Sequence, residues 1–294
     1  MSGIGHDHEL VAARSSTALT GSPPACLAPA GMPWTALTDP GCARRHNEDR
    51  FRVDPRLGAY ALADGMGGYN AGEVASGIAV SVFCEAVGAL REAGLPLIDA
   101  MRGAVAAAHA GIVECVRARP ECLGMGTTLV AAAIDGGRLT VAHVGDSRAY
   151  RWRDGALLAL TVDHSIGQQM LDRGRMTASQ VRRMPARGIL TRALGVAGDA
   201  PCPDLASVDW RPGDLLMLCT DGLTDRLDDR AIGAALAGSA VPAGPAGSAG
   251  AVGPVGTAGL AAIAHALIAA ALSAGCADNV TVVLAGGPSP PAGH

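Results

Sequence analysis

The stretch YALADGMGGYNAGE, residues 60–73, joins an apolar run to a glycine-rich loop through one carboxylate, Asp64. The residues before Asp64 are typical of a buried strand. Three glycines follow within the next four positions, where they leave room for a backbone or a ligand to approach closely. The stretch raises the question of why a buried strand should deliver a charged side chain into so open a loop.

Other expected strands also carry carboxylates at their ends. LLMLCTDG places Asp221 at the end of an apolar run, and CADNVTVVL places Asp278 at the start of another. Further carboxylates stand beside strands at Glu48 and Asp49 in RRHNEDRFRV, and at Asp146 in AHVGDSRAY. If these strands end at one edge of a sheet, or of two facing sheets, the carboxylates converge there.

Converged carboxylates repel one another and stay ionised together only if a cation joins them. Hard divalent ions such as Mg²⁺ and Mn²⁺ prefer oxygen ligands and keep several waters. Two such ions that share a carboxylate can lower the pKa of a bridging water and make it a nucleophile. Asp64 is therefore interpreted as a metal ligand held at a rigid strand end.

A structural interpretation of each Asp-Gly pair stands beside this one, because Asp-Gly is a common turn dipeptide. Asp135 and Asp154 are such turn residues in expected hairpins. An EF-hand loop is excluded because Leu223 stands where a third-position ligand is needed. GMGG also lacks the spacing of a dinucleotide-binding loop. The metal hypothesis therefore depends on the whole set of carboxylates.

The composition narrows the class of protein. The chain has 294 residues, 49% of them hydrophobic and 17% charged, with a formal net charge of −4. This balance provides no general attraction to nucleic acid or to an anionic membrane. All 23 basic residues are arginine, which excludes the lysine of a P-loop, of a kinase and of a Schiff base.

The cysteines and the N-terminus indicate a cytoplasmic protein. The eight cysteines form no C-x-x-C pair, so we expect them to be reduced and not to bind zinc. The first residues lack the basic and apolar regions of a signal peptide. No run reaches the roughly 18 apolar residues of a membrane span.

The regular elements indicate an α+β protein with antiparallel sheets. Two segments rich in Gly, Ala, Pro and Ser, a tail over 1–30 and a loop over 237–259, are expected to be flexible. A capping box is expected at 177–180. Periodicity and Asp-Gly turns predict helices over 71–90, 96–119 and 260–273, hairpins 127–134/138–144 and 148–152/156–161, and strands over 214–220 and 279–285.

Taken together and in order, these segments resemble the type 2C metal-dependent serine/threonine protein phosphatases, the PPM family, and especially its compact bacterial members. The resemblance covers roughly 34–285 and implies a four-layer α-β-β-α sandwich of two antiparallel sheets. It also implies one phosphatase domain over 31–287, with tails at 1–30 and 288–294. The segments that carry it are ARRHNEDR, ALADGMGGYNAGEVAS, GMGTTLVAA, AHVGDSRAYRWRDG, LTVDHS, ILTRALG, LLMLCTDGLTD and CADNVTVVL.

The resemblance implies a role for each candidate residue. Asp64 would bridge two Mn²⁺ or Mg²⁺ ions, and Asp221 and Asp278 would complete the ligands of the first ion. The Gly65 carbonyl, with Glu48 and Asp49 through water, would hold the second ion. Asp146 would help to bind a weaker third ion, together with Asp221. Arg44 would bind the substrate phosphate, with Arg45 as its rival, and the residues expected to be catalytic are Arg44, Asp64, Asp221 and Asp278.

Two features around this site depart from simple expectations. The family's histidines near the metal loop are replaced by Met66 and Tyr69, which leaves the general acid unassigned. Asp163, His164 and Ser165 have the residue types of a catalytic triad, but sequence neighbours point in different directions. We expect Asp163 and His164 to anchor the family's flap, whose RRMPAR segment is basic.

The function predicted from the sequence is hydrolysis of phosphoserine and phosphothreonine by a metal-activated bridging water. Phosphorylated proteins and a cognate serine/threonine kinase are the expected partners, and the protein is expected to be a monomer. The alternative is a non-catalytic PPM-like regulator that binds phosphoproteins. A cysteine-based phosphatase is excluded because no cysteine has an arginine six positions later, and the charge balance disfavours a nuclease.

Overall fold

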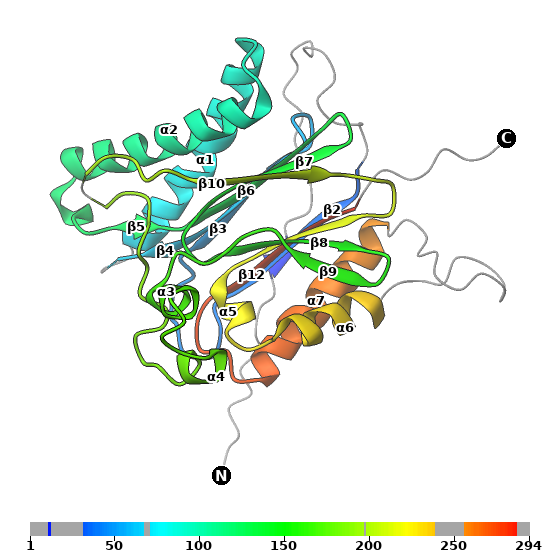
Figure 1. Ribbon diagram of the computed structural model, residues 1–294. Coiled ribbons are helices and arrows are strands. Elements are labelled where there is room, and N and C mark those ends of the chain that lie inside the picture. The colour runs from blue at the N-terminus through cyan, green and yellow to red at the C-terminus, as the bar shows by residue number, and fades with distance from the viewer. Residues whose placement is uncertain (1–10, 13–31, 68–70, 197, 239–255, 287–294) are drawn as a thin grey trace, which may run out of the picture.

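Two antiparallel sheets pack face to face in the computed structural model of the chain (Figure 1). The structure describes residues 11–12, 32–67, 71–196, 198–238 and 256–286. The first sheet has the strand order β1 (Val11–Ala12), β2 (Trp34–Asp39), β12 (Val280–Gly286), β11 (Leu215–Cys219), β8 (Arg148–Arg153) and β9 (Ala156–Ala159). The second has the order β10 (Asp204–Asp209), β7 (Arg138–Val144), β6 (Leu129–Asp135), β4 (Ala59–Met66) and β3 (Asp49–Asp54), and β5 (Gly126–Thr127) pairs with β4.

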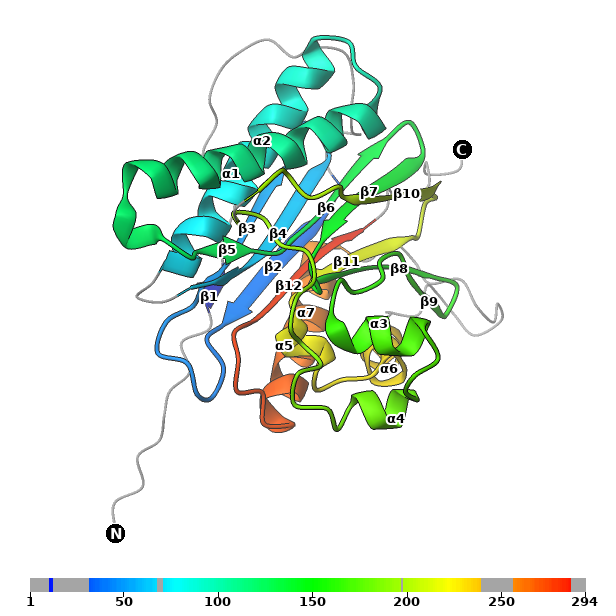
Figure 2. The same ribbon diagram turned by 60° about the vertical axis from the view of Figure 1, so that its left-hand side comes forward.

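Helices cover the outer faces of both sheets and complete the expected α-β-β-α sandwich (Figures 1 and 2). The second sheet is covered by α1 (Ala71–Glu92) and α2 (Leu97–Ala118), and a short 3-10 turn, η1 (Pro120–Cys122), follows. The first sheet is covered by α6 (Asp229–Gly238) and α7 (Thr257–Ser273), with α5 (Asp221–Thr224) at its edge. The remaining helices, α3 (Ile166–Asp172) and α4 (Ala178–Val181), stand to one side of the sandwich.

Burial on both faces explains why the strand before Asp64 reads as an unbroken apolar run. Tyr60 and Leu62 point into the core between the two sheets. The alternate residues, Ala61 and Ala63, belong to the core beneath α1 and α2, as the two-residue period of a strand requires. A strand without a solvent face holds its terminal carboxylate in a fixed position.

Most elements expected from the sequence are present. The helix expected over 71–90 is α1, both Asp-Gly hairpins form, and the Thr177 capping box with Gln180 is complete. The expected loop 237–259 is shorter, because α6 continues to Gly238 and α7 begins at Thr257. The rest of that loop and both expected tails lie outside the described residues, except that Val11–Ala12 pairs with β2.

One helix of the described residues, α1, is long and apolar enough to cross a membrane by length and composition. Its buried positions, such as Ala75, Ala79 and Phe83, belong to the core between the helices and the second sheet. Small side chains at this interface let the helix lie close to the strands. Packing in the core therefore accounts for the apolar character of α1.

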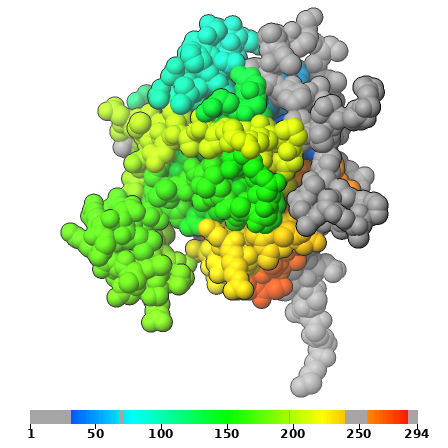
Figure 3. All heavy atoms as spheres, turned by 45° about the vertical axis from the view of Figure 1, so that its right-hand side comes forward, coloured from blue at the N-terminus to red at the C-terminus, as the bar shows by residue number. Residues whose placement is uncertain are grey.

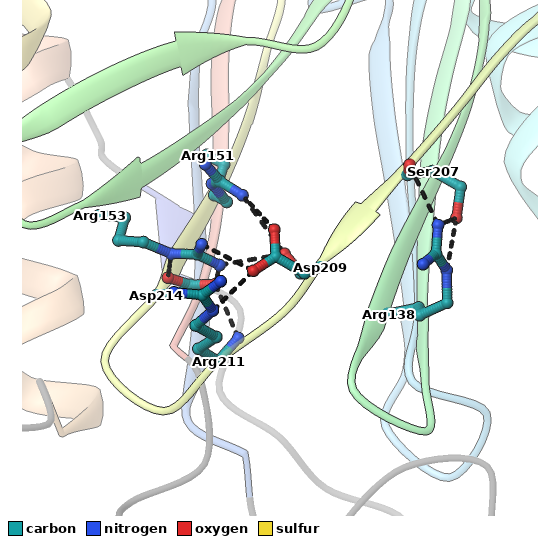
Figure 4. Close-up of polar contacts among 7 residues, drawn as sticks. All are labelled: Arg138, Arg151, Arg153, Ser207, Asp209, Arg211 and Asp214. Atoms are coloured by element: carbon teal, nitrogen blue, oxygen red, sulfur yellow. Dashed lines mark hydrogen bonds and ion pairs between the residues drawn. The ribbon is translucent and has the colours of Figure 1, made fainter.

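At the end of the sandwich away from Asp64, ion pairs join the two sheets (Figure 4). Arg151 and Arg153 extend from β8 to Asp209 on β10, at 3.1 and 2.9 Å. Arg153 also forms two hydrogen bonds, of 2.5 and 2.6 Å, with Asp214, whose side chain is 1% exposed. Arg211 donates to Asp209 at 2.6 Å. The pairs fasten the two sheets together at this end.

We expect Arg153→Met to lower the free energy of unfolding by about 3 kcal/mol, because it leaves the buried Asp214 carboxylate without its guanidinium. Urea denaturation of the metal-free protein measures this change. The control is Arg52→Met, which breaks the exposed pair with Glu85 and should cost less than about 1 kcal/mol. Equal losses in the two variants would contradict the role given to Arg153.

Candidate metal centre

The predicted site residues meet at one edge of the sandwich. A cavity of about 410 Å³ is lined by all of them except Asp49. The antiparallel pairing of β11 with β12 places the end of one strand beside the start of the other, so Asp221 and Asp278 become neighbours. The residues that line the cavity from the predicted set are Arg44, Glu48, Asp64, Gly65, Asp146, Asp221 and Asp278.

Asp49 lies behind the cavity wall and links the two sheets. It is paired in register with Asp64 on the neighbouring strand. Its Oδ2 accepts hydrogen bonds from Thr220 Oγ1 at 3.0 Å and from Thr281 Oγ1 at 2.6 Å. Its other oxygen, Oδ1, is buried and has no hydrogen-bond partner among the described residues. Asp49 therefore retains one buried oxygen that no hydrogen-bond donor of the described residues satisfies.

Burial and mutual repulsion disfavour ionisation of the clustered carboxyls. Burial, followed by the charges of Asp49, Asp221 and other neighbours, raises the pKa of Asp64 well above its ordinary value. The same causes raise the pKa of Asp49 to about 7, although hydrogen bonds from two threonines oppose the shift. Burial and nearby aspartates raise the pKa of Asp146 to about 8 and that of Asp221 to about 6. The metal-free cluster therefore holds protons more tightly than ordinary carboxyls, and a bound cation would relieve the same repulsion.

Arg44 contacts a predicted metal ligand. Its Nε lies 2.8 Å from Asp278 Oδ1, and its terminal nitrogen lies 2.9 Å from Oδ2. Both side chains are about half exposed. The sequence placed Arg44 beside a phosphate and did not indicate this pair, because Asp278 is 234 positions away. The two-pronged contact shows that the guanidinium fork reaches the mouth of the site.

Asn279 is a site residue that the sequence analysis missed. Its Oδ1 accepts the backbone N–H of Glu48 at 2.8 Å. Its amide nitrogen donates to the carbonyls of Pro40 and His46, each at 3.0 Å. Asn279 therefore holds the loop that carries Arg44 and Glu48 against the start of β12. The only sequence signal was an amide directly after Asp278.

Two threonines fix the backbone at Asp64. Thr128 Oγ1 accepts the Asp64 N–H at 2.9 Å, and Thr127 Oγ1 donates to the Asp64 carbonyl at 2.7 Å. Thr128 also shares a 2.7 Å hydrogen bond with Ser147, next to Asp146. The TT pair of the GMGTTLVAA segment therefore positions two carboxylates of the site at once.

The glycines after the aspartates serve backbone packing. A Cβ atom on Gly65 would lie 2.1 Å from the Gly72 carbonyl oxygen. A Cβ atom on Gly222 would lie 2.1 Å from the Asn279 carbonyl oxygen. At both positions, the close approach expected from the sequence is therefore that of another backbone segment, and a side chain there would clash with it.

Asp163, His164 and Ser165 do not form a catalytic triad. Asp163 makes two 2.7 Å hydrogen bonds with Arg148, and Ser165 caps α3 by accepting the Gln168 N–H. The backbone N–H of His164 donates to Gly145 at 2.7 Å, and its Nδ1 accepts the Gly145 N–H at 3.2 Å. As the sequence indicated, Asp163 and His164 anchor the start of the segment that carries α3 and α4.

Comparison with known proteins identifies the family. The family model described as "Protein phosphatase 2C" matches residues 43–248. The chain belongs to the protein phosphatase 2C family. The serine/threonine protein phosphatase PstP of Mycobacterium tuberculosis is 38% identical over 252 residues, which are 86% of this chain and 44% of PstP. A crystal structure of that phosphatase matches with a TM-score of 0.74 and 36% identity, covering 87% of this chain and 98% of the solved chain.

Other proteins of the 2C family are also similar to this chain in sequence and in structure. The phosphatase stp of Listeria monocytogenes is 36% identical over 198 residues, covering 65% of this chain and 78% of its own. A structure of the PstP catalytic domain in complex with two manganese ions matches with a TM-score of 0.71 and 35% identity, covering 87% of this chain and 97% of the solved chain. The chain spans under half the length of the M. tuberculosis relative.

The residues of this chain suit the manganese or magnesium ions of the 2C family. The donors are carboxylate oxygens, and two of them, Asp49 Oδ1 and Asp221 Oδ1, are buried without a hydrogen-bond partner. Among the described residues, no group of three His, Cys, Asp or Glu side chains is placed so that it could hold a metal ion by itself. A hard divalent ion does not require such a group, because it also accepts carbonyl and water ligands.

The raised pKa of Asp49 predicts how the stability of the metal-free protein depends on pH. Its ordinary value is 3.8 and its folded value is about 7, so the folded state holds a proton that the unfolded chain releases. Stability is therefore lost as the pH rises through this window. We expect the unfolding temperature in EDTA to fall between pH 5 and 8.

Two comparisons test this expectation by differential scanning calorimetry. Asp49→Asn, which cannot titrate at this position, should reduce the slope of unfolding temperature against pH. Added Mn²⁺ should raise the unfolding temperature more at pH 8 than at pH 5, because the cation replaces protons. A metal-free wild type whose stability rises over this range would contradict the assignment.

Proposed function

We propose that this chain is a metal-dependent serine/threonine protein phosphatase that hydrolyses phosphoserine and phosphothreonine in proteins. The observation that supports this most directly is the meeting of Asp64, Asp221 and Asp278 with Arg44 in one open cavity. The names of the relatives point to the same reaction. A bacterial serine/threonine kinase is the enzyme whose products such a phosphatase would consume.

In this proposal Asp64, Asp221, Asp278 and the Gly65 carbonyl would hold two ions, Glu48 and Asp49 would contribute through water, and Asp146 would help to hold a third. When bound, such ions lower the pKa of a coordinated water and neutralise phosphoryl charge. The remaining steps fall to the residues of the chain. Thr127 and Thr128 fix Asp64, and Asn279 orients the loop of Arg44 and Glu48.

Arg44 binds the substrate phosphate in this mechanism. Its guanidinium contacts a carboxylate through two nitrogens, and phosphate oxygens match the same fork. Cation binding at Asp278 and phosphate binding at Arg44 would each replace one half of their mutual ion pair. The two binding events therefore support each other. Protonation of the leaving serine oxygen falls to a group other than Met66, whose thioether carries no proton.

The cysteines support a location in a reducing compartment. All seven cysteines in the described part of the chain are free, which suits the cytoplasm.

The alternative function is that of a phosphoprotein-binding regulator without turnover. It predicts that phosphopeptides bind in the presence of Mn²⁺ but are not hydrolysed, so one assay of binding and turnover separates the two functions.

Metal removal tests the proposed reaction. We expect EDTA to abolish hydrolysis of a phosphothreonine peptide and added Mn²⁺ to restore it. Asp64→Ala should lower kcat by about 10²- to 10³-fold, the scale seen when one electrostatic stabiliser of the transition state is lost. The control is Asp99→Ala on the exposed face of α2, which should retain wild-type kcat. Full activity in metal-free buffer would rule out the proposed mechanism.

Arg44→Ala tests phosphate binding. Loss of charge-assisted hydrogen bonds, worth about 1.5–3 kcal/mol, should raise KM for the phosphopeptide by about 10-fold or more. Calorimetric Mn²⁺ affinity should not weaken, because the substitution frees Asp278. Arg45→Ala is the matched control, since Arg45 also lines the cavity. A larger increase in KM from Arg45→Ala would show that Arg45, and not Arg44, binds the phosphate.

A further inference from the structure

A second groove opens from the metal centre. It has a volume of about 1010 Å³ and lies between the segment of α3 and α4 and the turn from α5 into α6. Asp146, Gly188 and Asp221 line both this groove and the metal cavity, so the two spaces are continuous. In Figure 3 the yellow-green atoms of the α3–α4 segment form a lobe that stands off from the yellow atoms of α6.

The groove carries charged side chains on both walls. Five arginines line it, Arg148, Arg182, Arg187, Arg226 and Arg230. The four carboxylates outside the metal centre are Asp163, Asp225, Asp228 and Asp229.

Each of these four carboxylates accepts an ion pair or a hydrogen bond from within the protein. Arg148 pairs with Asp163, and Arg187 pairs across the groove with Asp225 at 2.6 Å. Asp228 accepts the Ala231 N–H, and Asp229 accepts the Tyr150 hydroxyl. Their capacity to attract a basic ligand is therefore partly used within the protein.

The other three arginines are not used in this way. Within the described residues, no ion pair or side-chain hydrogen bond joins Arg182, Arg226 or Arg230 to an acceptor. All three are exposed. Arg182 stands on the α4 wall, while Arg226 and Arg230 stand on the opposite wall. An anion in the groove would meet guanidinium groups from both sides.

We propose that this groove binds acidic or phosphorylated side chains that flank the scissile phosphoserine or phosphothreonine. This inference rests on the proposed phosphatase function and names the preferred substrate class. An extended peptide advances about 3.3 Å per residue, so a segment whose phosphate lies in the metal cavity continues directly into the groove. Substrates with further anionic residues on that side are then bound more tightly than neutral ones.

The test compares phosphothreonine peptides that share a core and carry glutamate, alanine or arginine flanks. The full chain with Mn²⁺ should show a kcat/KM several-fold higher for glutamate than for alanine flanks, since exposed charge pairs contribute about 1.4- to 5-fold each. The triple variant Arg182→Gln, Arg226→Gln and Arg230→Gln should bring this ratio close to one.

A matched control separates the groove from the total charge. The triple variant Arg117→Gln, Arg119→Gln and Arg183→Gln removes the same charge at exposed positions outside the groove lining, and it should retain the wild-type preference. An unchanged preference in the groove variant, or an equal loss in the control, would overturn the proposal. So would a wild type that does not distinguish the flanks.

Binding measurements keep this result independent of turnover. Fluorescence anisotropy of the same peptides gives dissociation constants whether or not the enzyme is active, and the glutamate peptide should bind the wild type several-fold more tightly than the alanine peptide. p-Nitrophenyl phosphate has no flanking residues, so its hydrolysis reports the proposed phosphatase activity alone. Loss of flank preference with intact turnover rejects the groove, whereas flank-dependent binding without turnover rejects only the phosphatase function.

Discussion

The crowding of buried carboxylates at one edge of the sandwich is the constraint on which the rest of the structure depends. Burial and the charges of neighbouring carboxylates raise the pKa of each buried carboxyl group, which makes ionisation costly. The groups concerned are Asp49, Asp64, Asp146 and Asp221. A flexible chain would relax this repulsion by moving the groups apart. The protein limits such relaxation because Asp64 lies on the doubly buried strand β4 and Asp49 is held by two threonine hydroxyls. Asp146 and Asp221 closely follow buried strands. A bound cation would relieve the remaining repulsion.

Holding both sheets at fixed positions is therefore part of building the site. At the metal end, Asp49 reaches from β3 to hydroxyls on the first sheet. At the opposite end, Arg151 and Arg153 cross from β8 to Asp209 on β10. Both links use carboxyl side chains at the ends of the interface and leave its centre to apolar packing. The interface thus resists sliding of one sheet over the other.

The sequence predicted the carboxylate set and the fold class because both follow from local signals. Strand ends are readable from apolar runs, and the hairpins from Asp-Gly turns. The contacts that could not be predicted join residues far apart in the chain, such as Arg44 with Asp278 and Asn279 with Glu48. The helix α6 (Asp229–Gly238) and the first residues of α7, from Thr257, were also missed, because segments rich in Gly and Ala carry little information about where a helix begins or ends.

The two parts of the cleft differ in how they are built, and this difference suits two tasks. The metal cavity is lined by groups at the ends of core strands, whose backbones are fixed by Thr127, Thr128 and Asn279. The groove is lined by exposed arginines on short helices and turns, where substitutions disturb little packing. Chemistry that needs precise ligand positions is thus located on the rigid sheets. If the groove binds the substrate as proposed, recognition is located on elements that can vary without moving the carboxylates.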